Sequence, residues 1–451
     1  MRRCTMSNPA GLLLAGLCAA GFGPELHAQD EPKEEADSGK TQDKTTDEQA
    51  EVYGYEREEQ QAAQEGVAGF FQRSADNITS QLQLEWLRFG GFIQSDPISL
   101  LGGQWRKFND DLYFTTRLDF GLAYTALWQG ATHGTGSRNA AAGDFDFFGT
   151  WHLVGQEGRT AGVLGFATEY RHDFGGIPPS ELNQSIGSIT RTANAFNTFD
   201  FTLRQLWWQQ LAADGRVLLR AGKIQMSDFF NTGRFRSANF FFLNQAFSSN
   251  LAVAFPTAGP GVVLFGFPSE SFYLAGGVGV ADPNEASSGF SGLTDGELFG
   301  TFETGFLTDL EGYGPGTYRF TFWGTDAVGS TGAPSGEGFA LSFDQQLGAF
   351  IPFVRYAYNN RRGLTQIRQI VSGGFGWENP FGNRGDVVGV GLAWVHPDTP
   401  LASDEYVFEA FYRIQITPTL QFTPDFQLIV DPAFGSEDVV GVFGLRFRVQ
   451  F

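Results

Sequence analysis

The closing stretch of the chain, residues 439–451, alternates between two kinds of side chain. One parity is apolar to the last residue, and it comprises Val439, Gly441, Phe443, Leu445, Phe447, Val449 and Phe451. The other parity turns polar and comprises Val440, Val442, Gly444, Arg446, Arg448 and Gln450. Because a strand places alternate side chains on opposite faces, the pattern predicts a strand with one apolar and one polar face.

The first 28 residues have the layout of a secretory signal. Arg2 and Arg3 precede an apolar run over residues 12–20, and Ala28 ends a plausible cleavage site. Cys4 and Cys18 are the two cysteines of the chain, and both lie in this segment. We therefore expect an exported protein with no disulfide, no cysteine nucleophile and no cysteine-bound metal, and we expect no cofactor.

The alternating pattern recurs along most of the chain and predicts about sixteen strands, an even number as a closed antiparallel bacterial barrel requires. The expected strands are 112–124, 144–154, 161–172, 199–211, 216–225, 261–268, 272–281, 299–308, 316–325, 336–347, 351–359, 364–376, 385–396, 404–416, 420–430 and 438–451. No stretch after the signal reaches the ~18 uninterrupted apolar residues of a spanning helix. The predicted fold is therefore all-β, a transmembrane antiparallel β-barrel.

Four regions follow from this pattern. Residues 1–28 are the signal, and residues 29–66 form an acidic, partly helical periplasmic linker. Residues 67–111 are assigned to the periplasmic mouth, and residues 112–451 to the barrel in the outer membrane of a Gram-negative bacterium. Short turns alternate with long loops, as outer-membrane barrels require for their periplasmic and external sides.

Charged and aromatic residues at the inward parity are candidates for contact with a solute. They are Arg117, Glu169, Arg171, Arg204, Arg220, Arg319, Trp323, Arg355, Glu409, Arg413 and Asp425. Arginine donates hydrogen bonds and a carboxylate accepts them, so together they suit sugar hydroxyls, while an indole face suits the C–H face of a sugar ring. For each residue the alternative is a structural ion pair across the barrel wall.

Several segments in order resemble the carbohydrate-selective porin family (OprB type). They are Arg220-Ala221-Gly222-Lys223 with Asp228-Phe229, Pro260-Gly261, Phe343-Asp344-Gln345 with Arg355-Tyr356, residues 385–391, Glu409 with Tyr412 and Gln415, Thr423-Pro424-Asp425-Phe426-Gln427, Pro432 and Arg446. The resemblance covers roughly residues 102–451. It implies a sixteen-stranded barrel that passes mono- and small oligosaccharides by facilitated diffusion through an Arg-rich, partly aromatic channel.

The long segment 226–260 resembles the porin loop that follows the fifth strand and folds into the barrel. The resemblance assigns Asp228, Arg234, Arg236 and Asn239 to a constriction. The alternative is an external loop that packs its phenylalanines on a neighbouring loop.

Other functions remain open at this stage. A general porin, or one for anions such as organic acids, is compatible with the arginines. A barrel enzyme would need a set such as His172, Asp173 and Ser180, whose spacing nothing in the sequence fixes. The net charge of −20 argues against nucleic acid. The expected partners are sugars, outer-membrane lipid and, through Phe451, the barrel assembly machinery, with the chain a homotrimer or a monomer.

Overall fold

The computed structural model describes residues 78, 81–82, 93, 97–155, 160–283, 293–294 and 296–451. The predicted signal (1–28) and acidic linker (29–66) lie outside the described residues, as does most of segment 67–96.

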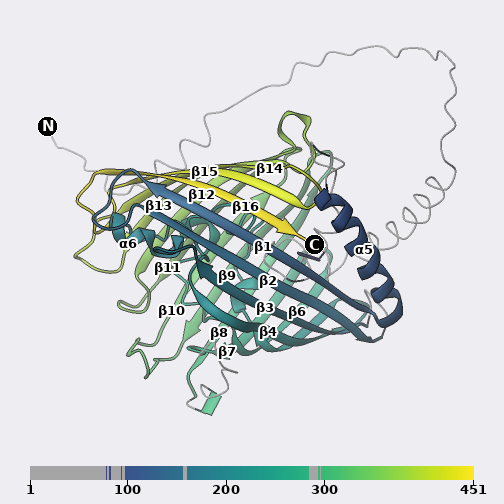
Figure 1. Cartoon of the computed structure of the whole chain (residues 1–451). Helices are drawn as coiled ribbons and strands as arrows, with labels where there is room; N and C mark the ends of the chain where they lie inside the picture. The colour runs from purple at the N-terminus through teal and green to yellow at the C-terminus, as the bar shows by residue number, and fades with distance from the viewer. Residues whose placement is uncertain are drawn as a thin grey trace, which may run out of the picture. The chain divides into compact units, whose positions relative to one another are not determined.

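Sixteen antiparallel strands close into one barrel, as predicted (Figure 1). The strands are β1 (Leu118–Ala131), β2 (Asn139–Val154), β3 (Gly162–Asp173), β4 (Phe199–Ala212), β5 (Val217–Ile224), β6 (Gly259–Ser269), β7 (Phe272–Val280), β8 (Leu298–Leu310), β9 (Gly314–Thr325), β10 (Gly336–Gln345), β11 (Phe350–Asn359), β12 (Ile367–Glu378), β13 (Val387–Pro397), β14 (Glu405–Gln415), β15 (Leu420–Val430) and β16 (Val439–Gln450). Each strand pairs with its neighbours in sequence, and β16 pairs with β1.

The two parities of the strands face opposite sides of the barrel wall. In β16, Phe443, Leu445 and Phe447 are exposed on the outer surface, whereas Arg446 and Arg448 are buried inside. Outward phenylalanines, leucines and valines recur on β6 to β9. This arrangement of an apolar outer band and a polar interior is typical of a barrel whose surroundings are lipid.

The first predicted strand begins too early. Residues Pro97–Thr116 form the helix α5, and β1 begins at Leu118. The hydroxyl groups of Thr115 and Thr116 donate to the carbonyls of Asp111 and Leu112, four residues earlier, in the way that suits a helix. The apolar residues of segment 112–116 satisfy a period of two as well as a helical spacing, so alternation alone could not separate the two structures.

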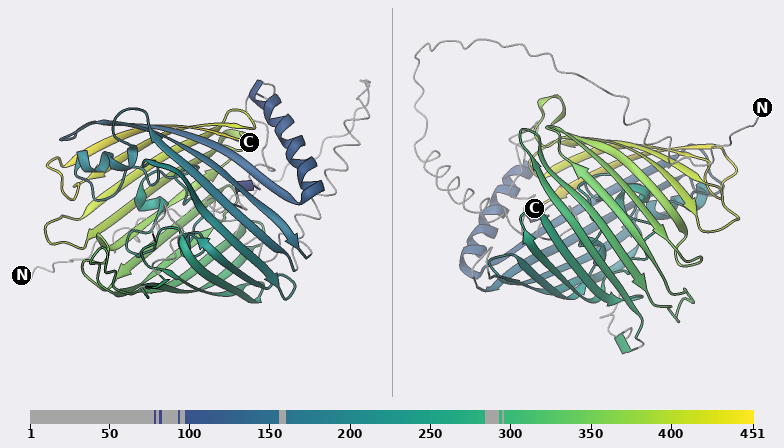
Figure 2. Two further views of the ribbon diagram at one scale, coloured as in Figure 1. Left: turned by 60° about the horizontal axis from the view of Figure 1, so that its bottom comes forward. Right: turned by 180° about the vertical axis from the view of Figure 1, so that it is seen from behind.

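The two ends of the barrel differ in their connections. Residues 213–216, 311–313 and 416–419 are short turns at the end where α5 and the carboxyl terminus lie, which Figures 1 and 2 show. The opposite end carries long loops with short helices, namely η1 (Pro179–Glu181), α6 (Leu182–Ile186), η2 (Met226–Asp228) and α7 (Gln245–Ser248). A further short helix, η3 (Pro380–Gly382), belongs to a connection at the first end. Among the described residues, no helix is both long and apolar enough to span a membrane.

Candidate functional site

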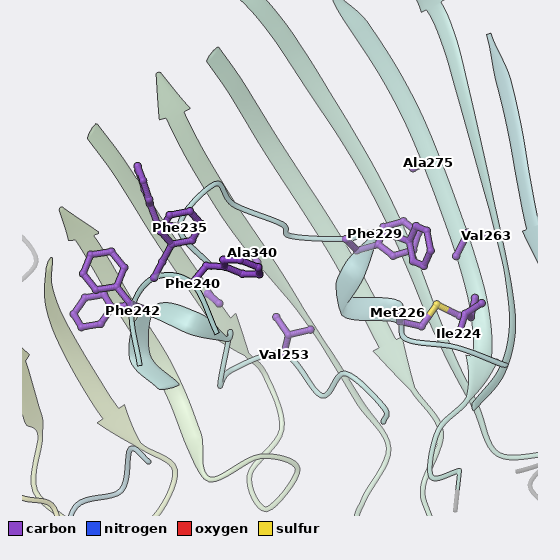
Figure 3. Packing of buried hydrophobic residues seen from close by; sticks show 14 of the residues in the cluster. Ile224, Met226, Phe229, Phe235, Phe240, Phe242, Val253, Val263, Ala275 and Ala340 are labelled. Carbon is purple, nitrogen blue, oxygen red and sulfur yellow. The ribbon is translucent and has the colours of Figure 1, made fainter. Parts of the chain in front are cut away.

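The loop between β5 and β6, residues 225–258, lies inside the barrel, as predicted. Most of its side chains are buried, and Phe229, Phe230, Phe240 and Phe242 are almost fully so. They belong to the largest apolar cluster of the described residues, which also includes wall residues such as Val263 and Ala275 (Figure 3). The cluster therefore lies between the inner loop and the lumenal face of the wall. We call this segment the inner loop.

Two buried glutamates of the wall hold the inner loop through its backbone amides. Glu409 on β14 accepts hydrogen bonds from the amides of Leu243 at 2.5 Å and Asn244 at 3.0 Å. Glu303 on β8 accepts one from the amide of Asn231 at 2.6 Å. A carboxylate that accepts backbone amides forms strong, charge-assisted hydrogen bonds, so both residues fix the path of the loop.

Three wall arginines hold the carbonyl groups of the same loop. Arg355 donates to the carbonyls of Phe247 and Ser249, each at 2.9 Å. Arg319 donates to the carbonyl of Thr232 at 3.2 Å and pairs with Asp344 at 3.0 Å. Arg446 donates to the carbonyls of Ala238 and Phe241. Because these guanidinium groups are buried and already donate hydrogen bonds to the loop, they are not open to a solute.

Lumenal glycines make room for the phenylalanines of the inner loop. A Cβ atom at Gly376 on β12 would overlap the ring of Phe235, and one at Gly391 on β13 would lie 2.7 Å from the ring of Phe247. Phe235 also contacts Phe353 of β11 in a tilted arrangement, with ring centroids 6.0 Å apart. The two glycines thus allow aromatic rings to lie directly on the barrel wall.

A second loop, residues 174–198 between β3 and β4, is anchored in the same manner. Glu405, the first residue of β14, accepts hydrogen bonds from the hydroxyl of Ser188 at 2.8 Å, the amide of Ile189 at 2.9 Å and the hydroxyl of Thr190 at 2.6 Å. The amide of Asn194 donates to the carbonyl of Leu243 in the inner loop at 2.8 Å. The two loops therefore form one connected structure inside the wall.

Three predicted residues on β3 and β4 form a charged cluster that remains partly open to the lumen. Arg171 Nη2 lies 3.0 Å, and Arg204 Nε 3.3 Å, from the same Glu169 oxygen. Their side chains keep 11–19% of their surface exposed, whereas the five wall residues that hold the inner loop are buried. Both guanidinium groups lie over the ring of Phe199, at 4.9 and 5.5 Å from its centroid. We call Glu169, Arg171 and Arg204 the lumenal cluster.

A β-bulge explains how Arg204 joins this cluster. Ala167 pairs with Gln205 and Thr168 pairs with Leu203, so Arg204 is an additional residue in β4. A bulge re-aims side chains, and here it places both Arg204 and Gln205 on the inner side. Arg204 also donates to the side chain of Gln225 at 3.3 Å, where the inner loop begins.

Most other predicted residues of the inner loop have structural partners. Asp228 accepts from Gln205 at 2.8 Å. Arg236 is buried and donates to the carbonyls of Ser227 at 2.7 Å and Ser248 at 3.2 Å, so it braces the loop from within. Arg234 is half-buried and donates to Gln346 at 3.2 Å, and Asn239 is also half-buried.

The remaining predicted residues of the wall are buried as well. Arg220 lies 3.6 Å over the ring of Trp207, and Arg413 lies 4.9 Å over the ring of Phe241. Asp425 accepts from Gln427 at 3.1 Å. Trp323 stacks on Phe299 and is fully buried, so its indole face cannot cover a sugar ring.

The prediction that Arg117 points into the lumen from a strand is wrong. Arg117 lies between α5 and β1 with a left-handed backbone (φ 62°) and is exposed. It sits over the ring of Tyr113 at the rim of the barrel. The error follows from the helix that replaces the first five residues of the predicted strand, 112–116.

Sequence reasoning missed four buried acids of the wall, Asp144, Asp146, Glu303 and Glu405. All four occupy the inward parity of a strand, which was the available signal. Asp144, Asp146 and Glu169 are close enough together to hold a metal ion. However, Asp144 lies 3.1 Å from Arg171 and Asp146 lies 3.6 Å from Arg448, so these acids fit an ion-pair network.

The chain is similar to known porins in sequence and in fold. The family described as carbohydrate-selective porin, OprB family, matches residues 176–451. The high-pH structure of OprB from Pseudomonas putida is similar in fold, with a TM-score of 0.63 at 19% identity over 77% of this chain and 97% of that one. A mutant porin of Rh. blastica gives a TM-score of 0.47 at 11% identity over 74% of this chain and 100% of that one. No curated protein matches the sequence significantly. With its closed sixteen-stranded barrel and inward-folded loops, the chain belongs to the OprB family of carbohydrate-selective porins and is a channel of the outer membrane.

Proposed function

We propose that mono- and small oligosaccharides pass the constriction by contact with the lumenal cluster. The observation that supports this is a difference in burial and bonding between two groups of charged wall residues. Glu303, Arg319, Arg355, Glu409 and Arg446 hold the inner loop, whereas Glu169, Arg171 and Arg204 stay partly open to the lumen.

The chemistry of the cluster suits a neutral polyol. Two arginines supply several donors in fixed planes, and Glu169 supplies acceptors, so both roles of a hydroxyl group can be met. Phe199 lies under both guanidinium groups and orients them. Asp144 adds a second carboxylate beside Arg171, which balances the two positive charges. We expect weak, saturable binding, because a permeating solute has to leave again.

The test is a swelling assay on proteoliposomes with glucose and a maltose series. Arg204→Ala and Arg171→Ala should each slow glucose entry about tenfold, which corresponds to ~1.4 kcal/mol and to the loss of a charged hydrogen bond. Arg138→Ala, in an exposed external loop, is the matched control and should leave the rate unchanged. Wild-type rates in both cluster variants, with normal barrel content by circular dichroism, would remove the cluster from the sugar path.

Selectivity against anions is tested in the same preparation. Single-channel current should show saturable block by glucose and little block by phosphate. Block by phosphate alone would instead indicate an anion channel, for which Arg171 and Arg204 would be the determinants.

We infer a channel without catalytic activity, whose region 1–28 is a signal, 29–66 an acidic periplasmic linker and 67–111 the periplasmic-mouth segment. The proposed barrel domain, 112–451, has its first strand at Leu118. Partners of the barrel would be outer-membrane lipid and the assembly machinery, which would read Phe451, and the chain would act as a homotrimer or a monomer.

A further inference from the structure

Helix α5 lies outside the barrel wall, along the end with the short turns (Figures 1 and 2). It packs against the start of β1, where the side chain of Asn109 donates to the carbonyl of Phe120 at 2.6 Å. The indole of Trp151 on β2 donates to the carbonyl of Thr116 at 2.9 Å. The short-turn end of an outer-membrane barrel faces the periplasm, so α5 lies at the level of the periplasmic leaflet.

A continuous row of aromatic rings connects α5 to the outer face of the barrel. Trp105 contacts Phe120 with ring centroids 5.3 Å apart, and Phe108 contacts the same ring at 6.3 Å. Phe120 in turn contacts Phe147 of β2 at 5.8 Å, and Phe147 contacts Phe166 of β3 at 5.2 Å. Phe120, Phe147 and Phe166 sit at the outward parity of their strands. Lipid that covers these three rings therefore also reaches Trp105 and Phe108, which form the aromatic side of α5.

The sides of α5 differ in what they meet. Tyr113 contacts His152, at 6.0 Å between ring centroids, on the side toward the rim of the barrel. Phe108 points to the side of the outer wall and keeps 54% of its surface exposed in spite of its contacts with Trp105 and Phe120. Lys107 is exposed on a third side, because neighbouring residues of a helix point about 100° apart. Phe114, which is also exposed, lies seven residues from Lys107 on the same side and is not part of the aromatic side.

From this arrangement we propose that α5 is an interfacial helix that rests on phospholipid of the periplasmic leaflet. The aromatic side, with Phe108 at its edge, enters the boundary between headgroups and acyl chains, and the side of Lys107 faces the periplasm. An amphipathic helix parallel to the membrane is stabilised in this manner, and aromatic rings favour that boundary. Continuity with the lipid-covered wall selects lipid as the occupant of this surface.

The test is depth-dependent quenching in vesicles of phosphatidylethanolamine and phosphatidylglycerol. A polarity-sensitive fluorophore is attached to a single cysteine in the full chain, in a background where Cys4 and Cys18 are replaced by Ser. The probe positions are Phe108→Cys and Thr115→Cys, which share one side of the helix, since residues seven apart lie almost in line. Lys107→Cys is the control on the periplasmic side, and Leu264→Cys on the exposed outer face of β6 is the control inside the membrane.

The proposal predicts that nitroxide groups at the headgroup and upper acyl positions quench the probes at 108 and 115. The probe at 107 should instead be quenched by iodide in the buffer, and the probe at 264 by nitroxides deep in the bilayer. Thr115 is exposed and polar, so its variant keeps the experiment informative if Phe108→Cys fails to fold. Quenching of the 108 and 115 probes by iodide alone would overturn the proposal. Protection of both from iodide and nitroxide would overturn it as well, because protein would then cover this side.

Discussion

At the scale of single residues, glutamates at the inward parity of the strands lie in two different environments. Glu303, Glu405 and Glu409 accept backbone amides of the inward-folded loops, and their burial leaves no surface for a solute. Glu169, by contrast, shares two arginines and stays partly open. The same residue type at the same parity thus holds an inward-folded loop in one place and, as we propose, meets a solute in another.

Glu409→Gln should loosen the inner loop. A glutamine side chain offers one acceptor oxygen and turns an NH₂ group toward the second backbone amide, so one of the two hydrogen bonds at Leu243 and Asn244 is lost. We expect a loss of about 1–3 kcal/mol in the free energy of unfolding in detergent and faster entry of maltotriose relative to glucose.

Glu337→Gln on the exposed end of β10 is the matched control for this substitution and should change neither property. An unaltered ratio of maltotriose to glucose entry in Glu409→Gln would mean that the inner loop does not set the width of the channel.

Gly376→Ala should displace the inner loop by steric conflict. A methyl group at this position would overlap the ring of Phe235, which packs between the wall and Phe241. Overpacking of this kind costs roughly 1–3 kcal/mol, and we expect a lower midpoint of thermal unfolding. Gly300→Ala on β8, where a Cβ atom has no neighbour within 4 Å, should leave the midpoint unchanged. Equal midpoints in the two variants would contradict the packing described for Phe235.

At the scale of elements, the strands were predictable from alternation and the helices were not. Predicted strands such as 420–430 agree with the structure at both ends, because each strand has one face toward lipid and one toward the lumen. Helix α5 was missed because the spacing of Leu112 and Thr116 fits both the two-residue period of a strand and the 3.6-residue period of a helix. The bulge at Arg204 was missed because an extra residue shows only once the pairing of β3 with β4 is known.

At the scale of the whole molecule, closure of the barrel depends on the last residues. The backbone of Phe451 exchanges two hydrogen bonds with Leu122 of β1, at 2.7 and 2.8 Å, so the end of the chain completes the seam between β1 and β16. A closed barrel leaves no unpaired strand edge in the membrane, where an unpaired backbone group is costly.

Deletion of Phe451 should reduce the yield of folded barrel. It removes both seam bonds, each worth about 0.5–1.5 kcal/mol, together with the terminal aromatic ring. The measurement is the fraction of heat-modifiable, protease-resistant barrel in isolated outer membranes. The control variant Phe451→Tyr keeps the aromatic ring and the backbone hydrogen bonds, so it should give the same yield as the unmodified chain. A normal yield after the deletion would show that neither the seam nor the ring is needed for assembly.

The sequence by itself determined the barrel, its strand number and the inward path of the loop after the fifth strand. Those features depend on local alternation, on the length of the connections and on a family resemblance, all of which can be read along the chain. Only the tertiary structure decided which charged side chains bind the loops and which remain exposed to the lumen. The reason is that partners such as Glu409 and Leu243 are 166 residues apart in the sequence. Parity tells which face a side chain takes, but its partner on that face depends on how the loops fold back into the lumen.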